Sequence, residues 1–250
     1  MSQLLTSGTA PQVPAPSHFV QLYDADELSL ARSVGRYLHE GWQRGDGLVV
    51  IASGAHAAAF AAELERLGVD SGAAVRDARL LLLDAHDTLA RFLVAGRPDP
   101  GLFRETVNGA LASVRSDGGS IRAYGEMVGV LWQAGHESAA IALEGLWNEL
   151  LAEERLELYC AYPIDVFGDD FHVAGIDQVL CAHTHLVPTG GEQNLESAIE
   201  RAMADVLGTR ADGLRPLMKA NYRPSWGSSR AARPSFSGCA TTCRTTPARF

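Results

Sequence analysis

The sequence predicts an α/β fold with a mostly parallel sheet, and two observations support that prediction. Continuous apolar runs over residues 48–52 and 80–83 are typical of parallel strands that are buried on both faces. Segments of ten or more residues with helical periodicity separate the predicted strands, which is the pattern of right-handed βα units. The chain has 250 residues, of which 46% are hydrophobic, so it can form a substantial core.

The first half of the chain predicts three strands, each followed by a helix. A strand over residues 18–23 precedes a helix over residues 27–40, and Asp24 and Glu27 have the spacing of a capping box. The strand over residues 48–52 precedes a helix over residues 55–67, with Ser53 as its N-cap. The strand over residues 80–83 resembles a Walker B strand, but we interpret its last residue, Asp84, as the N-cap of a helix that runs to residue 95.

The second half of the chain predicts two more strands with helices between them. A helix near residues 102–115 precedes a strand over residues 121–124 and a turn over residues 125–127. Two helical runs follow, the second over residues 136–151, and then a strand that ends at residues 158–163. A last helix is predicted over residues 192–207.

Polar side chains that packing does not explain concentrate between residues 121 and 163. Arg122 and Tyr124 alternate with apolar neighbours, so a strand sends both side chains to one face. Glu126 follows at a helix start, where the helix dipole stabilises a carboxylate. Glu144 and Asn148 are four residues apart on one face of the next helix. We expect these groups to converge at the carboxyl end of a strand, where open α/β sheets bind ligands.

Each of these candidates also has a structural interpretation. Glu126 could serve only the helix dipole and pair with Arg122, and we expect these two residues to meet in a partly closed crevice. Glu144 and Asn148 could belong to a solvated helix face. The remaining aromatic candidates divide between core and pocket: Trp147 is expected in the core, whereas Tyr159 and Tyr162 suit either place.

Three segments, taken in order, resemble the MEDS family, the methanogen/methylotroph DcmR-type sensory domain: Arg122-Ala-Tyr-Gly-Glu126-Met127, Glu144-Gly-Leu-Trp147-Asn148 and Cys160-Ala-Tyr-Pro163. The similarity extends from about residues 18–23 to His183-Thr184-His185. The resemblance implies a sensory domain on a three-layer, RecA-like α/β scaffold flanked by helices, usually joined to kinase, anti-sigma or DNA-binding output modules. We therefore interpret residues 18–208 as a MEDS-like sensory domain, residues 1–17 as a flexible leader, and residues 209–250 as a disordered basic tail.

A RecA-like scaffold invites a nucleotide, but the sequence lacks the groups that hold one. A P-loop needs a glycine-rich turn and a lysine for the phosphates. The turn after the first strand holds three acidic residues and no glycine, and the chain's only lysine is Lys219. We therefore expect a degenerate P-loop without tight ATP binding or hydrolysis, and no cofactor.

Cys181, His183 and His185 have spacing that could bind zinc if the segment is extended and both imidazoles lie on one side. The alternative is a fixed turn that ends at Pro188, with the histidines bonded to backbone carbonyls, and we prefer it. We therefore name no metal site, and keep these three residues as weak candidates only.

Charge and composition restrict the partners and the location. The net charge is −9, and residues 210–250 hold eight basic residues and one acidic residue, so the preceding part carries −16. Such a surface repels nucleic acid. The start of the chain shows no export signal and no window is apolar enough to span a membrane, so we expect a cytoplasmic protein. The abrupt change in composition near residue 210 also suits a truncated or out-of-frame end, in which case an output module would be missing.

The sequence thus predicts a non-catalytic sensory and signal-transduction module of a bacterial regulator. We expect it to bind an unknown small molecule or a signalling partner protein of the histidine kinase or anti-sigma type, and to regulate a kinase, anti-sigma or transcriptional output. The expected ligand-binding residues are Arg122, Tyr124, Glu126, Glu144, Asn148 and Tyr162. The alternatives are a hydrolase-type enzyme with Glu126 and Glu144 as an acid/base pair, or a metal-binding domain through Cys181, His183 and His185.

Overall fold

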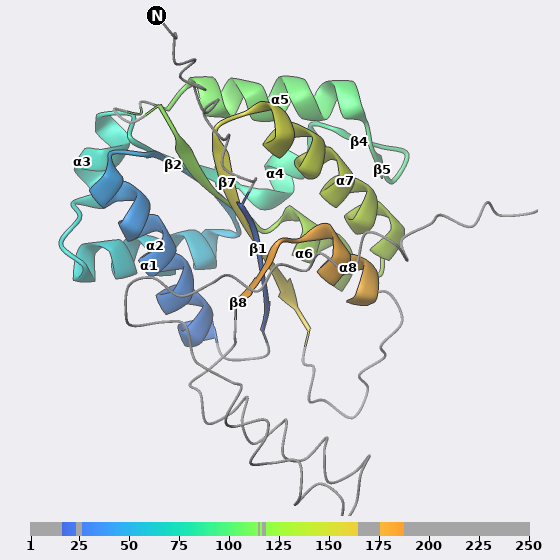
Figure 1. Ribbon diagram of the computed structural model, residues 1–250, viewed down its shortest axis with the longest axis horizontal. Helices are drawn as coiled ribbons and strands as arrows, with labels where there is room; N and C mark the ends of the chain where they lie inside the picture. The colour runs from blue at the N-terminus through green and yellow to red at the C-terminus, as the bar shows by residue number, and fades with distance from the viewer. Residues whose placement is uncertain (1–16, 24–26, 115, 117–118, 165–175, 188–250) are drawn as a thin grey trace, which may run out of the picture.

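The computed structural model describes residues 17–23, 27–114, 116, 119–164 and 176–187, and it contains a six-stranded sheet (Figure 1). The strands lie in the order β3-β2-β6-β7-β1-β8, and all neighbouring strands are parallel. Their bounds are β1 Ser17–Tyr23, β2 Gly47–Ala52, β3 Leu80–Asp84, β6 Ile121–Gly125, β7 Leu156–Pro163 and β8 His185–Val187. The parallel α/β sheet predicted from the sequence is confirmed. Several predictions lie outside the described residues. They are the flexible leader except for its last residue, Ser17, the capping position Asp24, the helix over residues 192–207 and the basic tail.

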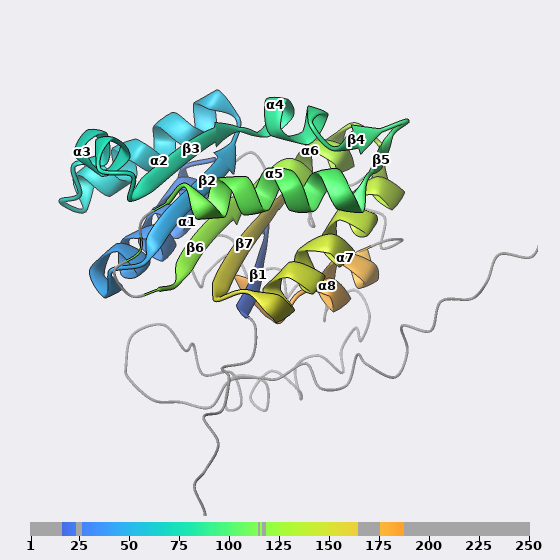
Figure 2. The same ribbon diagram turned by 90° about the horizontal axis from the view of Figure 1, so that it is seen from above.

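Helices cover both faces of the sheet and give the molecule three layers (Figure 2). One core lies between the sheet and the first helices, on what we call the α1 face; the other lies beneath the later helices, on the α7 face. The α1 face carries α1 Glu27–Arg44, α2 Gly54–Arg66 and α3 Ser71–Arg76. The α7 face carries α4 Ala85–Ala90, α5 Pro100–Ala112, α6 Met127–Gln133, α7 Glu137–Glu153 and α8 Ile176–Ala182.

Several local predictions are confirmed by side-chain contacts. Ser53 is the N-cap of α2, and Asp84 is the N-cap of α4, where its Oδ1 accepts a hydrogen bond from the backbone N–H of Asp87 at 2.9 Å. Trp147 is a core residue that packs edge-on against Phe103, with ring centroids 5.1 Å apart. Asp84 therefore serves the helix as the sequence predicted.

Several elements differ from the sequence prediction, among them helix α8, which was not predicted. Helix α4 ends at Ala90, and a short hairpin, β4 Leu93–Val94 with β5 Arg97–Pro98, replaces the predicted last turn. Ala95 and Gly96 form the hairpin turn with positive φ, a conformation that a helix cannot contain. Helix α3 was not predicted, and α1 continues through Gly41 to Arg44.

The strand order creates a topological switch point between β2 and β6 (Figure 2). After β2 the chain moves outward to the edge strand β3, whereas after β6 it moves in the opposite direction to β7. In open α/β sheets, ligands bind beyond the carboxyl ends of the strands at such a point. Residues that follow β2 and β6 line this position.

Candidate functional site

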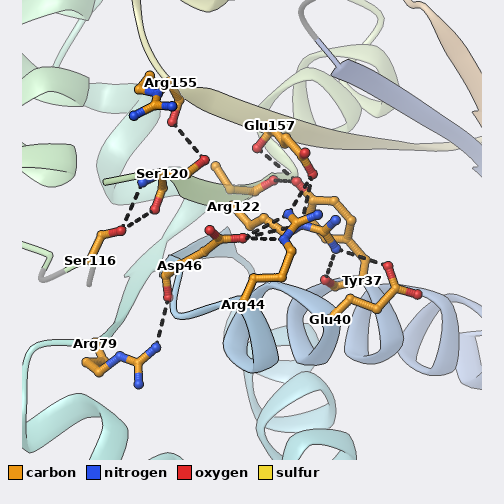
Figure 3. A network of polar contacts seen from close by, with 11 residues as sticks. Tyr37, Glu40, Arg44, Asp46, Arg79, Ser116, Ser120, Arg122, Arg155 and Glu157 are labelled. Atoms are coloured by element: carbon orange, nitrogen blue, oxygen red, sulfur yellow. Dashed lines mark hydrogen bonds and ion pairs between the residues drawn. The ribbon is translucent and has the colours of Figure 1, made fainter. Parts of the chain in front are cut away.

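Arg122 lies near the amino end of β6, within a network of charged groups on the α1 face (Figure 3). Its Nε lies 2.8 Å from Glu157 Oε2 and 4.0 Å from Asp46 Oδ2, and its Nη1 lies 3.3 Å from Glu40 Oε2. The same guanidinium donates to the backbone carbonyl of Tyr37 and lies over that ring, 4.5 Å from the centroid. We call these residues, together with Arg44, the Arg122 network.

The expected pair between Arg122 and Glu126 is not formed. The two residues lie at opposite ends of β6, and each has other partners. The sequence prediction placed Tyr124 and Arg122 on one face, and this part is right: Tyr124 packs edge-on against Phe60 of α2 on the α1 face. The error lay in the direction of Arg122, which turns back toward the amino edge because three carboxylates gather there.

Glu126 lies at the switch point, where it connects the start of α6 to the start of α2. Its Oε2 accepts a hydrogen bond from the backbone N–H of Ser53 at 2.8 Å, and its Oε1 lies 2.9 Å from Nδ1 of His56. Glu126 is the N-cap residue of α6 but makes no side-chain capping bond there. Its carboxylate therefore serves the α2 side, and the hydrogen bond that it accepts from His56, opposed by burial, raises the pKa of His56.

Aromatic rings enclose the Glu126–His56 pair. Tyr23 meets the His56 ring edge-on, with ring centroids 6.0 Å apart. Phe60 stacks with the His56 ring, with centroids 5.8 Å apart. Tyr124 is fully buried, and its hydroxyl has no hydrogen-bond partner among the described residues. Burial and the nearby Glu126 carboxylate raise the pKa of Tyr124 well above its ordinary value, so this hydroxyl stays a donor. We call Tyr23, Ser53, His56, Tyr124 and Glu126 the switch-point site.

A second polar cluster is buried on the α7 face, between the sheet and helices α7 and α8. It consists of His18 on β1, Glu144 on α7, Cys160 on β7 and His183 after α8, and their ligand atoms all lie within 4.8 Å of one another. We call these four residues the His18–His183 cluster. Its members are at most 5% exposed, so the solvated helix face considered for Glu144 is wrong.

The contacts within the cluster centre on the Glu144 carboxylate. Oε2 lies 3.4 Å from Nε2 of His18 and 3.9 Å from Sγ of Cys160, while Oε1 lies 3.3 Å from Nε2 of His183. The hydroxyl of Tyr162 donates to Oε1 at 2.6 Å. Nε2 of His18 also lies 3.4 Å from Sγ of Cys160.

Neighbouring oxygen atoms fix the orientation of both imidazoles. Nδ1 of His18 lies 3.0 Å from Oδ1 of Asn148 and 3.2 Å from the carbonyl oxygen of Ala182, and both of these atoms accept hydrogen bonds only. Nδ1 of His183 lies 2.6 Å from the carbonyl oxygen of Val179. Each Nδ1 therefore carries a proton, and each ring directs its Nε2 into the cluster.

Burial and mutual charge shift the ionisation of the cluster. Burial, and next the charge that His183 would carry, lower the pKa of His18 to about 4, so its ring is neutral at neutral pH. Burial by itself raises the pKa of Glu144, but His183 and then His18 outweigh it and lower that pKa to about 2. Burial and the adjacent Glu144 raise the pKa of the Cys160 thiol well above its ordinary value.

The structure thus separates the six predicted ligand residues into three places. Glu144, Asn148 and Tyr162 meet at the His18–His183 cluster, Tyr124 and Glu126 meet at the switch-point site, and Arg122 belongs to its own network. Glu126 and Glu144, considered from the sequence as an acid/base pair, share no hydrogen-bond or ion-pair partner among the described residues and belong to two different sites.

Sequence reasoning missed His18, His56 and Cys160 as site residues. The alternation of β1 and β7 places His18 and Cys160 on the face that carries Glu144, but only the register between the strands brings them together. His56 follows the Ser53 cap in the first turn of α2, a position that the sequence does reveal.

The proposed metal trio of Cys181, His183 and His185 does not converge through its histidines. His183 contacts Glu144 on the α7 face, whereas the His185 ring stacks on Phe19 with centroids 4.7 Å apart. The bond from His183 to the Val179 carbonyl matches the alternative of histidines held by backbone oxygens. Cys181 lies on α8 instead of an extended segment.

A parallel sheet covered by helices on both faces places the chain in the class of three-layer α/β domains. Comparison with known families is more specific, because the model of the methanogen/methylotroph, DcmR sensory domain (MEDS) matches residues 17–184. The chain belongs to this family, and a sensory or regulatory role follows from that membership. No curated protein matches the sequence significantly. Among the described residues, no helix combines the length and hydrophobicity needed to cross a membrane.

Proposed function

We propose that the chain is a non-catalytic sensory module that binds a small molecule at the switch-point site and regulates a signalling partner. The observation that carries the proposal is the buried Glu126–His56 pair beside Tyr124, whose hydroxyl lacks a partner among the described residues. A buried donor without a partner is costly, at about 1–3 kcal/mol, so such groups are kept where a ligand can satisfy them. The position between β2 and β6 is where open α/β sheets bind ligands.

The charges of the site favour a neutral or cationic small molecule over a nucleotide triphosphate. The Glu126 carboxylate already accepts the Ser53 N–H at the start of α2, so a negative charge occupies the anion-binding end of this helix. No lysine follows on α2 to neutralise a phosphate, and an added anion would face Glu126 at close range. A ligand with an acceptor for Tyr124 and a donor for Glu126 suits the aromatic walls formed by Tyr23 and Phe60.

The same bonds supply a route from ligand to output. Helix α2 covers the α1 face and α6 covers the α7 face, so the Glu126–His56 contact joins the two helical layers across the sheet. A ligand that competes for Glu126 would release α2 from α6, and a ligand that bridges them would tighten the junction. Either case shifts the balance between two arrangements, which a partner of the histidine kinase or anti-sigma type could detect. We propose no nucleic-acid or membrane partner, and a cytoplasmic location.

The test begins with small molecules that the full chain retains on purification, identified by native mass spectrometry. Each compound found is then added to wild-type protein, Glu126→Gln, His56→Gln and the control His86→Gln, an exposed histidine on α4. We expect a compound that raises the melting temperature of wild type and His86→Gln, with the effect lost in Glu126→Gln. Equal binding by all four proteins, catalytic turnover of the compound, or micromolar affinity for ATP would contradict the proposal.

A further inference from the structure

The His18–His183 cluster presents more acceptors than donors to a small buried volume. Two imidazole lone pairs and two carboxylate oxygens face one another, and the strong donor aimed at them is the hydroxyl of Tyr162. Nε2 of His183 lies 3.3 Å from Glu144 but makes no hydrogen bond among the described residues, so a proton on this atom would be poorly aligned with the carboxylate. A buried group of acceptors without matching donors needs a cation.

The separations between the ligand atoms fit one metal ion. In a tetrahedral zinc site with metal–nitrogen and metal–oxygen distances of about 2.0–2.1 Å, neighbouring ligand atoms lie about 3.3–3.4 Å apart, and pairs that include sulfur lie about 3.6 Å apart. The observed contacts are 3.3 Å and 3.4 Å from Glu144 to the two histidines, and 3.4 Å and 3.9 Å from Cys160 to His18 and Glu144. The two remaining pairs, from His183 to His18 and to Cys160, lie within 4.8 Å, so the side chains must move closer together to complete the shell.

The surrounding groups hold the ligands as the outer shell of a metal site does. Metal-binding histidines donate their other N–H to a carbonyl or amide oxygen, which fixes the tautomer. His18 does so toward Asn148 and Ala182, and His183 does so toward Val179. Tyr162 holds Glu144 through a hydrogen bond of 2.6 Å.

We propose that His18 Nε2, His183 Nε2, Cys160 Sγ and the Glu144 carboxylate bind one divalent transition-metal ion, with Zn²⁺ as the best match. Nitrogen, sulfur and oxygen ligands in tetrahedral arrangement are those that zinc prefers. On binding, the Cys160 thiol loses its proton to solvent, so the thiolate and the Glu144 carboxylate together balance the charge of the ion. Four protein ligands leave no open position, so the ion has a structural role.

The metal would fix the end of α8 and the start of β8 to the sheet. His183 lies between these two elements, and Thr184 next to it bonds to the carbonyl of His18 at 3.0 Å. The other ligands come from β1, β7 and α7, so the ion joins four parts of the fold. The proposal concerns the opposite face from the switch-point site, and it does not depend on the proposed sensing function.

The first test uses the wild-type full chain. The purified protein is treated with chelator, reloaded with Zn²⁺ or Co²⁺, and its metal content is measured by mass spectrometry. We expect about one ion per chain and, in the cobalt-loaded protein, a sulfur-to-cobalt charge-transfer band. X-ray absorption at the zinc edge should show one sulfur at about 2.3 Å and three lighter ligand atoms at about 2.0–2.1 Å. A chain that binds no zinc at stoichiometric level, or a first shell without sulfur, would overturn the proposal.

The second test identifies the ligands. Cys160→Ser and His183→Gln are compared with His185→Gln, a neighbouring histidine whose ring stacks on Phe19 on the other face. We expect zinc affinity to fall at least 100-fold in the first two variants and to stay unchanged in the control. Asn148→Ala, which removes an exposed outer-shell group, should weaken zinc binding by roughly 10- to 100-fold while the fold is kept. Undiminished binding in both Cys160→Ser and His183→Gln would place the ion elsewhere and refute the site.

Discussion

The Arg122 network and the His18–His183 cluster both surround buried ionisable side chains, yet they differ in how their charges are matched. In the network, Arg122 and Arg44 face three carboxylates, two of which, on Glu40 and Glu157, remain partly open to solvent. In the cluster, acceptors face acceptors, and solvent reaches none of the four residues appreciably. The buried Arg122 is matched by opposite charges, whereas the buried cluster has an excess of hydrogen-bond acceptors.

The largest effect is expected from removal of Arg122. In Arg122→Met the buried Asp46 and the partly buried Glu157 lose a cation, and we expect a loss of roughly 3–5 kcal/mol in the free energy of unfolding. Urea unfolding measures this loss, with Arg104→Met, whose ion pairs are on the surface, as a control that should unfold like wild type. A double-mutant cycle should show coupling of Arg122 to Glu157 and none to Glu126. The opposite pattern would restore the pair expected from the sequence.

The second-largest effect is expected from zinc, which should stabilise the protein through the His18–His183 cluster and not through the Arg122 network. If free zinc is present at 100 times the dissociation constant, the proposed site should stabilise the fold by about 2.7 kcal/mol over the chelator-treated protein. Cys160→Ser should lose this increment, whereas Glu157→Gln, which alters only the Arg122 network, should keep it. Thermal and urea unfolding with and without zinc measure the difference. An equal zinc increment in both variants would end the distinction between the regions.

A smaller effect is expected from the glycine that makes room for Arg122. A Cβ at Gly41 would lie 2.7 Å from Cδ of Arg122 and 3.1 Å from its Cγ, which requires the guanidinium to move away from its partners. We expect Gly41→Ala to cost about 1–3 kcal/mol in unfolding free energy. Gly109→Ala, in α5 with nothing within 4 Å of the added Cβ, should instead stabilise slightly. A neutral Gly41→Ala would show that the network tolerates displacement.

The sequence predicted the parallel strands, the Ser53 and Asp84 caps and the buried Trp147, because each depends on local pattern and burial. It could not predict which polar residues meet. Arg122 and Glu126 are four positions apart on one strand and its turn, yet they face opposite ends of the sheet. His18 and Cys160 come together through strand pairing across 142 positions of sequence, which no local pattern encodes.

The smallest expected effect is the pH dependence of stability that the His56–Glu126 pair causes at the switch-point site. The hydrogen bond that His56 donates to Glu126 raises the pKa of His56 above its ordinary value of 6.5, so the protonated form is favoured by folding. The stability from this pair is therefore fully present below pH 6.5 and is lost as the pH rises through the folded pKa of His56. We expect the melting temperature of wild type, relative to His56→Gln, to be higher near pH 6 and to converge toward that of the variant at higher pH.

Thermal unfolding of both proteins across this range measures the difference, with His86→Gln as the control for an exposed histidine. A difference that grows as the pH rises would mean that His56 is neutral in the folded protein, so that its contact with Glu126 would be a hydrogen bond without charge.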